Sequence, residues 1–305
     1  MQDTYVAGHT GLVGSALTRA LDKENISWFG KTHSELDLLD RQAVLEFVGD
    51  TKPQAVIIAA AKVGGIVAND SQPVEFLSEN IRISTNLIDA CHATNVSRVL
   101  FLGSSCIYPR MAPQPIKEEY LLTGPLEPTN ESYALAKISG LKLIQAYRRE
   151  YGRRWISAMP TNLYGPGDNF DLQNSHVLPA TIRKFATAVK EGSTTVGMWG
   201  TGKPRREFLH VDDLARACLH LLENYDEDVC INIGTGQDIE IRELAEMVAD
   251  VVGFNGAVEW DTSKPDGMPR KLLDVSRING LGWQAQIDLK SGIRDTYNWY
   301  LTNHS

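Results

Sequence analysis

Cysteine is scarce in this sequence, which has four in 305 residues: Cys91, Cys106, Cys218 and Cys230. None of them belongs to a CxxC pair, and their spacing does not match that of a structural zinc site. A disulfide-bonded secreted domain is therefore not expected. We predict reduced thiols in a cytoplasmic protein that has no metal site.

Positive charge is also in deficit. Lys and Arg number 30 against 38 Asp and Glu, for a net charge of −8, which argues against binding to nucleic acid or to an anionic membrane. The sequence has no apolar run long enough to span a membrane, no signal-type start and no repeats. A chain of this length can bury a substantial core, so we expect one large or two smaller domains.

Glycine is concentrated near the start, in Gly8-His-Thr-Gly11-Leu-Val-Gly14. The β-prone run Thr4–Ala7 precedes it, and Ser15–Asp22 follows with helical spacing. A strand, a glycine-rich turn and a helix in this order form the phosphate-binding start of a dinucleotide fold. The spacing is GxxGxxG rather than GxGxxG, so a simple β–α turn remains the alternative.

The residues after the second strand decide which dinucleotide binds. We expect that strand over Ile26–Gly30, and an NAD site would place an acid directly after it for the ribose 2′-hydroxyl. Here Lys31 comes first, and the first acid is Glu35. A cation at this place suits a 2′-phosphate, so we predict NADP(H). The alternative is that Lys31 is a solvated loop lysine.

The first half of the chain alternates apolar β runs with helical patterns. The strand candidates are Ala55–Ala61, Arg98–Gly103 and Trp155–Pro160, and a helical pattern covers Pro73–Ala93. Continuous apolar strands between helices indicate a parallel sheet covered on both faces. We therefore predict an α/β protein with a Rossmann-type doubly wound parallel sheet.

From about Leu163 the sequence is rich in Gly, Pro, Asn and Asp, and we expect short elements and loops from there on. One return to the sheet is expected, through a helix from Val211 to the strand Val229–Ile233. The predicted dinucleotide-binding domain is therefore 1–162 plus about 211–238. The predicted substrate-binding lobe is smaller and discontinuous, and it comprises about 163–210 plus 239–305.

Tyr133 and Lys137 stand four residues apart in a segment with helical character. This spacing puts both side chains on one face of the helix, one turn apart. An ammonium beside a phenol stabilises the phenolate, so we expect Lys137 to lower the Tyr133 pKa toward a useful range for acid–base catalysis. The alternative is a solvated lysine beside a half-buried aromatic ring.

Polar residues follow the predicted strands where ligands bind in open parallel sheets, at the carboxyl ends. Lys62 follows one strand, Ser104 and Cys106 follow the next, and Asn162 follows the third. Ser104 and Cys106 are two residues apart, so an extended backbone would point both side chains to one side. A serine can donate to a substrate carbonyl, and an ionised thiol can remove a proton. The alternative for Cys106 is a small buried apolar residue.

The glycine-rich turn, Ser104 and the Tyr133–Lys137 pair together resemble the extended short-chain dehydrogenase/reductase superfamily, which acts on nucleotide sugars. The resemblance extends over the whole chain. A finer pattern resembles the GDP-L-fucose synthase family within it. Its motifs are the heptapeptide from Gly103 to Pro109, the pentapeptide from Asn162 to Pro166, Ser175–Pro179, Arg206–Asp213 and Pro265–Lys271.

The resemblance implies NADPH-dependent 3,5-epimerisation and 4-reduction of GDP-4-keto-6-deoxy-D-mannose. Cys106 would remove the protons at C3 and C5 as base, and His176 would return a proton to the opposite face. Ser104 and Tyr133 would bind the C4 oxygen, and Tyr133 would protonate it during reduction. Lys137 would bind the nicotinamide ribose. Family members are usually homodimers, so a homodimer is implied as well.

The binding sites are also implied by the resemblance. The implied cofactor residues are Gly8, Thr10, Gly11, Leu12, Val13, Gly14, Lys31, Asp40, Ala60, Ala61, Lys62, Ser104, Tyr133, Lys137, Pro160, Asn162, Leu163 and His176. The implied residues for the GDP-sugar are Asn162, Lys184, Trp199, Arg206, Asp266, Arg270 and Lys271. The alternatives are ordinary surface cations for the arginines and lysines, a core position for Trp199, and a capping or surface role for His176.

Sequence features separate this interpretation from its rivals. A nucleotide-sugar 4-epimerase or 4-ketoreductase would share the glycines and the Tyr133–Lys137 pair but would not need Cys106 and His176. A 4,6-dehydratase would need an acidic pair after the serine, and this chain has none there. A non-catalytic NADP(H)-binding sensor would have no need of Ser104 and the pair. Thr10 stands where the family often has a basic residue, which weakens the NADP preference without reversing it.

Overall fold

The computed structural model describes residues 3–172, 175–264 and 266–304. Its largest sheet has six parallel strands, and most of their side chains are buried. In sheet order they are β2 (Trp28–Phe29), β1 (Thr4–Ala7), β3 (Ala55–Ile58), β4 (Arg98–Leu102), β5 (Ile156–Pro160) and β9 (Ile231–Ile233). Apolar runs without alternation form such strands because both faces of the sheet are covered. The predicted parallel sheet is confirmed.

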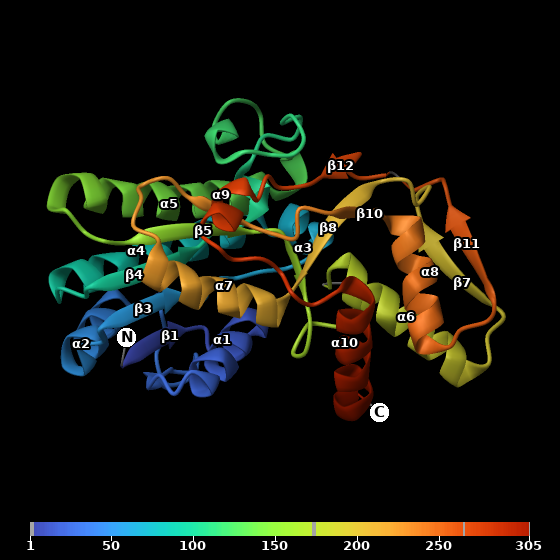
Figure 1. Ribbon diagram of the computed structural model, residues 1–305, viewed down its shortest axis with the longest axis horizontal. Coiled ribbons are helices and arrows are strands. Elements are labelled where there is room, and N and C mark those ends of the chain that lie inside the picture. The colour runs from blue at the N-terminus through green and yellow to red at the C-terminus, as the bar shows by residue number, and fades with distance from the viewer. Residues whose placement is uncertain (1–2, 173–174, 265, 305) are drawn as a thin grey trace.

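Helices cover both faces of this sheet (Figure 1). On one face α1 (Leu12–Lys23) packs against α7 (Val211–Asn224), whereas α2 (Arg41–Thr51), α4 (Pro73–Ala93) and α5 (Glu131–Tyr151) pack side by side on the other. The helix bounds follow local signals, since Pro73 occupies the first turn of α4 and Gly152 ends α5 in the left-handed region. The doubly wound arrangement is therefore confirmed, and we call this sheet with its helices the first lobe.

The strand order reverses next to β1. The chain leaves β1 toward β2 on one side and later returns to β3 on the other. The crevice beyond the carboxyl ends of two such strands is where doubly wound sheets bind ligands. In this fold it lies between Gly8, which follows β1, and Ala60, which follows β3.

A second lobe surrounds β8 (Arg205–His210), which pairs with β6 (Asn162–Tyr164), β10 (Asp238–Glu240) and β12 (Arg270–Lys271). A separate pair is formed by β7 (Thr195–Trp199) and β11 (Ala257–Asp261). The helices are α6 (Val177–Glu191), α8 (Ile241–Val252) and α10 (Leu289–His304). They pack on an apolar cluster of their own, separate from that of the first lobe (Figure 1).

The expectation of short elements and loops after Leu163 was wrong for these three helices. Each is amphipathic, and its apolar residues recur at helical spacing between polar ones, so the average composition of the segment does not reveal it. The short helices that complete the fold are α3 (Ile66–Ser71), α9 (Ser276–Gly280) and three 3-10 turns at Ser105–Ile107, Glu118–Tyr120 and Pro128–Asn130. The division of the chain into two domains stays a prediction.

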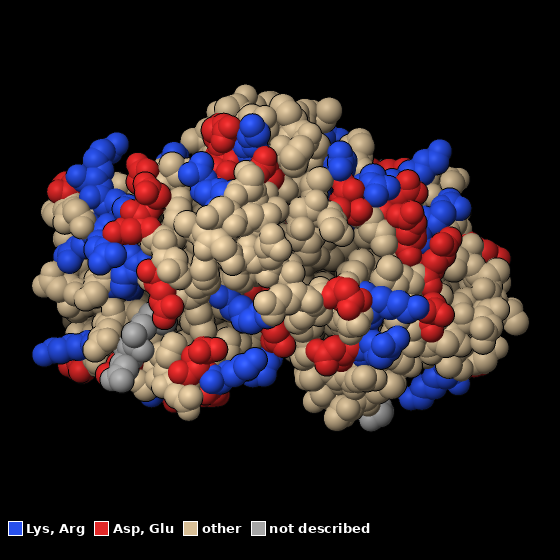
Figure 2. All heavy atoms as spheres, viewed as in Figure 1, with Lys and Arg blue, Asp and Glu red and all other residues tan. Residues whose placement is uncertain are grey.

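Two surface properties concern the expected partners. Figure 2 shows basic and acidic side chains interspersed over the face in view, with no large area of one sign. Within the described residues, no helix has the length and apolar character needed to cross a membrane.

Candidate active site

The glycine-rich turn brings the backbones of three segments into close contact. Gly8 has φ +85°, and a Cβ there would lie 2.8 Å from the backbone nitrogen of Ala60. A Cβ on Gly14 would lie 1.9 Å from the carbonyl oxygen of Gly8, whereas one on Gly11 would keep 3.6 Å from that atom. Packing within the chain thus requires glycine at 8 and 14. Gly11 caps α1 at its N-terminus, where backbone N–H groups face the crevice and suit a pyrophosphate.

The loop after β2 holds an ion pair. Lys31 lies 3.3 Å from Glu35, which also accepts hydrogen bonds from the backbone N–H of Thr32 at 2.8 Å and from its hydroxyl at 2.7 Å. These two bonds and then Lys31 lower the pKa of Glu35 to about 2. The Lys31 ammonium therefore lies beside the carboxylate of Glu35, which is four residues later in the chain. Asp40 caps α2 by accepting from the N–H groups of Gln42 and Ala43, so its side chain has a structural role.

The segment after β3 continues from Ala60 and Ala61 into Lys62. The backbone N–H of Lys62 donates to the side chain of Asn80 at 2.8 Å, and Asn80 donates back to the Lys62 carbonyl at 3.0 Å. The Lys62 ammonium forms ion pairs with Glu75 and Glu79 on α4. This exchange of hydrogen bonds fixes the backbone beside the glycine turn, and it directs the Lys62 charge toward α4.

Ser104 and Cys106 come together in a way that differs from the predicted one. Ser105–Ile107 form a 3-10 turn rather than extended chain, so residue alternation does not apply. Instead Ser104 occupies the capping position of this turn. Its hydroxyl oxygen accepts a hydrogen bond from the backbone N–H of Cys106 at 3.4 Å. Burial raises the pKa of the Cys106 thiol. Three neighbours act to lower it, and in order of decreasing effect they are Lys271, Ser104 and Lys137.

Tyr133 and Lys137 lie on one face of α5 as predicted, with the Lys137 ammonium 5.7 Å from the centre of the tyrosine ring. The ammonium donates to the carbonyl oxygen of Leu102, at the end of β4, at 2.8 Å. The expectation that Lys137 lowers the Tyr133 pKa was wrong: burial, and then the nearby Cys106, raise it. Burial lowers the pKa of Lys137 to about 8, against an opposing influence of Cys106.

Pro160 ends β5, and Asn162 and Leu163 open β6, so the three residues lie where the chain passes from the first lobe to the second. The Asn162 side chain donates to the carbonyl oxygen of Glu207 on β8 at 2.7 Å. His176 occupies the capping position of α6. The pKa of the His176 imidazole is lowered, first by desolvation and then by the positive charge of Lys271.

The predicted substrate residues of the second lobe fall into two groups. Trp199 is 66% exposed. The ammonium groups of Lys184 and Lys264 lie 5.9 and 5.8 Å, respectively, from the centre of its ring. Lys184 also donates to the carbonyl oxygen of Gly197 at 3.0 Å. An exposed indole between two cations suits a flat, negatively charged ligand.

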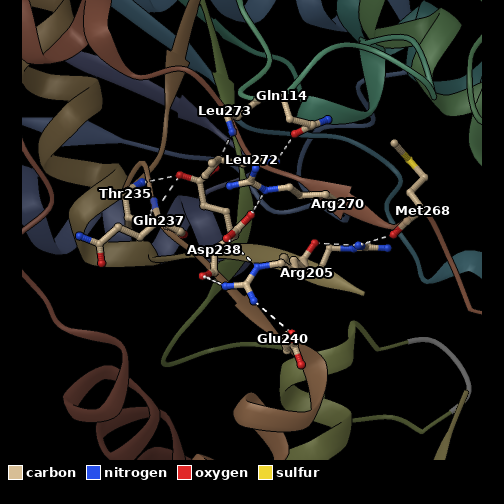
Figure 3. Close-up of polar contacts among 12 residues, drawn as sticks. Gln114, Arg205, Thr235, Gln237, Asp238, Glu240, Met268, Arg270, Leu272 and Leu273 are labelled. Carbon is tan, nitrogen blue, oxygen red and sulfur yellow. Dashed lines mark hydrogen bonds and ion pairs between the residues drawn. The ribbon is translucent and has the colours of Figure 1, made fainter. Parts of the chain in front are cut away.

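The other group is paired within the lobe. Arg270 forms an ion pair with Asp238, which also binds Arg205 (Figure 3). Asp266 accepts hydrogen bonds from the backbone N–H and the hydroxyl of Thr201 at 2.8 and 2.6 Å, which fixes the turn after β7. Asp266 and Arg270 thus help to shape the lobe, and their role in substrate binding stays a prediction.

Arg206 and Lys271 lie opposite each other, since β12 pairs with β8 in the register Lys271 to Arg206. One guanidinium nitrogen of Arg206 donates to the carbonyl oxygen of Met268 at 2.6 Å. A small cavity between the lobes is lined by residues of both, among them Cys106, Asn130, Met268 and Lys271. The structure thereby brings Cys106 and Lys271, far apart in the sequence, into one site.

Three residues near the site were missed by sequence reasoning. Glu207, Asn130 and Lys264 were assigned no role from the sequence, although Glu207 lies within the motif Arg206–Asp213. For Glu207 the available signal was its place before Phe208 and Leu209 in β8, since a carboxylate buried with apolar residues needs specific partners.

Comparison with known proteins agrees with the geometry. Residues 4–234 match the model of the NAD dependent epimerase/dehydratase family. The chain is 55% identical over 300 residues to GDP-L-fucose synthase 1 of Arabidopsis thaliana, covering 98% of this chain and 93% of that protein. 

Solved structures share the fold at lower sequence identity. A GDP-6-OMe-4-keto-L-xylo-heptose reductase from C. jejuni has a TM-score of 0.94 at 38% identity, covering 99% of this chain and 98% of that one. A GDP-L-fucose synthetase from Naegleria fowleri bound to NADP has a TM-score of 0.91 at 30% identity, covering 99% and 95%. The chain therefore belongs to the NAD dependent epimerase/dehydratase family, and within it to the GDP-L-fucose synthases.

Proposed function

We propose that the protein uses NADPH to convert GDP-4-keto-6-deoxy-D-mannose into GDP-L-fucose. The observation that carries the proposal is the position of the Cys106 thiol. It lies beside the Tyr133–Lys137 pair and opens on a cavity that the second lobe completes with Lys271. A plain reductase needs a tyrosine and a lysine, and the added thiol supplies a base for epimerisation.

Epimerisation begins with proton removal next to the ketone. The 4-keto group acidifies the protons at C3 and C5, because the resulting carbanion is an enolate. Cys106 removes each proton, and the hydroxyl groups of Ser104 and Tyr133 stabilise the negative charge on the C4 oxygen. His176 returns a proton to the other face of the sugar. Inversion requires an acid and a base on opposing faces.

Reduction then consumes the same ketone. When bound, the nicotinamide supplies a hydride to C4. Tyr133 donates a proton to the C4 oxygen, and its raised pKa keeps the phenol protonated at neutral pH, which is the form that a donor needs. Lys137, held by the Leu102 carbonyl, presents its ammonium to the nicotinamide ribose and to the tyrosine ring.

The cofactor residues fit a nicotinamide dinucleotide, because Gly8 and Gly14 keep the turn tightly packed and the N-terminus of α1 begins directly after it, with N–H groups that suit a pyrophosphate. We favour NADPH over NADH for two reasons. Lys31 is the first charged residue after β2, and one structural relative is described as bound to NADP. The carboxylate of Glu35 beside Lys31 makes this preference weaker than a free lysine would give.

The GDP-sugar is proposed to bind across the second lobe. Trp199 and Lys184 offer an indole face and a cation, and Arg206 keeps guanidinium donors beyond the one that Met268 occupies. A diphosphate suits this arrangement, since guanidinium groups form paired hydrogen bonds with phosphoryl oxygens.

The deciding experiment is turnover of GDP-4-keto-6-deoxy-D-mannose with NADPH in D₂O, with the product identified by NMR. We expect GDP-L-fucose that carries deuterium at C3 and C5. The Cys106→Ser variant should lose this exchange, because an alcohol is a far weaker base than a thiolate. Exchange at the rate of the unaltered protein in that variant would remove Cys106 from the mechanism.

A second candidate is 4-reduction of a GDP-sugar without epimerisation. The observation that favours it is the likeness to the C. jejuni reductase. In the same experiment this function would give a reduced sugar with its original configuration and no deuterium at C3 or C5. That product would overturn the proposed epimerisation and leave the role of Tyr133 intact.

A further inference from the structure

A cation from the second lobe lies in the same cavity as Cys106. We propose that Lys271 is the positioning residue that makes Cys106 a base, by holding its thiolate next to the substrate carbon. The inference rests on the proposed function, because it assigns Lys271 to the proton-removal step. It differs from a simple role of Lys271 in binding the diphosphate.

The geometry of β12 directs Lys271 into the cavity. Neighbouring side chains in a strand point to opposite faces. Arg270 points to Asp238, with which it forms an ion pair (Figure 3). Lys271 therefore points to the other face, where it lines the cavity with Cys106.

Backbone contacts on both sides hold this strand in place. The N–H of Leu272 donates to the side chain of Gln114 at 2.8 Å, and the N–H of Leu273 donates to Glu207 at 3.0 Å (Figure 3). At the other end the carbonyl of Pro269 accepts from the N–H of Arg205 at 2.8 Å. Lys271 is thus carried by a segment fixed to both lobes rather than by a free loop.

Within the residues that the structure describes, no carboxylate forms an ion pair with the Lys271 ammonium. The charged and titratable groups that interact with it are Cys106, Arg206, Glu207, Glu127 and His176. The Glu207 carboxylate accepts backbone N–H groups from Thr235, Gly236 and Leu273. The ammonium is therefore left to interact with an anion in the cavity.

The cations around Cys106 differ in their availability. Lys137 is committed to the carbonyl oxygen of Leu102, whereas Lys271 has no such partner among the described residues. Burial raises the pKa of the thiol, and Lys271 exerts the largest opposing influence. With the Lys271 charge removed, a smaller fraction of the thiol would be ionised at any pH, and less of it could act as a base.

The proton balance of the step is simple. The C–H bond at C3 or C5 breaks, its proton forms an S–H bond with the Cys106 thiolate, and its electron pair enters the enolate on the C4 oxygen. His176 then gives a proton to the opposite face of the carbon. Lys271 keeps all its protons throughout. Its charge also lowers the pKa of His176, which makes that imidazolium a stronger acid.

The test measures the thiol directly. The rate of alkylation of Cys106 by iodoacetamide is followed between pH 6 and pH 10 by mass spectrometry of the peptide that contains it. In Lys271→Met we expect a rate at pH 8 about tenfold lower, since an opposite charge nearby shifts a pKa by about one unit or more. Lys271→Arg should restore most of the rate, because it keeps the charge.

Arg270→Met is the matched control. It removes a cation from the same strand but from the opposite face, so the pH dependence of Cys106 alkylation should not move. Unchanged alkylation in Lys271→Met, or an equal loss in Arg270→Met, would overturn the proposal. A purely substrate-binding role of Lys271 would raise KM in turnover and leave the thiol titration in place.

Deuterium exchange at C3 and C5 extends the test to the reaction. Lys271→Met should exchange about tenfold more slowly at pH 7 and recover as the pH rises, because a higher pH ionises the thiol without help. Exchange that stays slow at every pH would contradict the proposal. If the unaltered protein turns over no 4-keto sugar but the alkylation shift is present, the proposed function fails while the Lys271–Cys106 relation stands.

Discussion

The crevice edge of the first lobe and the β8–β12 face of the second lobe both surround the proposed site, but they are built differently. The first uses backbone: Gly8 and Gly14 let three segments meet without side chains between them. The second uses charged side chains, and several of them, such as Arg270 with Asp238, already bind each other. A charged residue in a binding motif is therefore not by itself a ligand contact, and its existing partners must be counted first.

The largest loss is expected for Tyr133, whose hydroxyl has no hydrogen-bond partner among the described residues. Tyr133→Phe removes the proposed proton donor to the C4 oxygen and changes little else, because the ring stays in place. We expect single-turnover NADPH oxidation to fall by about 10²- to 10⁴-fold. Deuterium exchange catalysed by Cys106 should fall much less. Reduction at the rate of the unaltered protein would remove Tyr133 from the mechanism.

The backbone character of the crevice is tested at Gly14 and Gly11. In Gly14→Ala the new Cβ would overlap the Gly8 carbonyl, and we expect a loss of about 3 kcal/mol in the free energy of unfolding, with NADPH binding lost as the turn shifts. Gly11→Ala has room for its Cβ and should remain as stable as the unaltered protein. Thermal unfolding and NADPH fluorescence titration measure both. Equal behaviour of the two variants would contradict the packing argument.

The ion pairs of the second lobe are tested through Asp238→Asn. Burial raises the pKa of Asp238, but hydrogen bonds from Arg270 and Arg205 outweigh it, so the pKa lies below its usual value. The stability that Asp238 contributes is thus complete above the pKa of an unfolded aspartate and is lost as the pH falls through the lowered value. We expect the variant to lose about 2 kcal/mol in the free energy of unfolding at pH 7.

Denaturant unfolding at pH 7 and near pH 3 separates this charge effect from a packing effect. The difference between Asp238→Asn and the unaltered protein should shrink at the lower pH. A difference of the same size at both values would mean that the carboxylate charge is unimportant. Activity is a weaker readout here, because Asp238 holds the strand that carries Lys271.

Much of the first lobe could be predicted from the sequence because its signals are local. The apolar run Arg98–Gly103 gave β4, and the pattern Pro73–Ala93 gave α4 with the same bounds. The helix of Tyr133 and Lys137 was also predicted. The pKa of Tyr133 was not, because burial depends on how α5 packs against the sheet, and spacing along one helix does not contain that information.

The second lobe was harder to predict because its contacts join distant segments. Lys271 reaches Cys106 only through the pairing of β12 with β8, across a separation that no local pattern spans. Asp266 and Arg270 stay predicted substrate residues, but their contacts with Thr201 and Asp238 could not be predicted from the sequence. The turn Ser105–Ile107 brought Ser104 and Cys106 together although the predicted extended geometry was wrong.

The smallest effect is expected at the ion pair of Lys31 with Glu35, where the crevice edge uses charged side chains instead of backbone. Glu35→Gln removes a carboxylate beside the proposed 2′-phosphate and frees Lys31, so the KM for NADPH should fall by a few-fold, a small effect because the charge pair is exposed. The KM for NADH should change little, because NADH has no 2′-phosphate. Lys31→Met should act in the opposite direction. Thr32 also donates hydrogen bonds to Glu35, so the substitution could move the loop. A fall in the KM for both cofactors would show that it had moved. The preference for NADPH would then have to come from another residue.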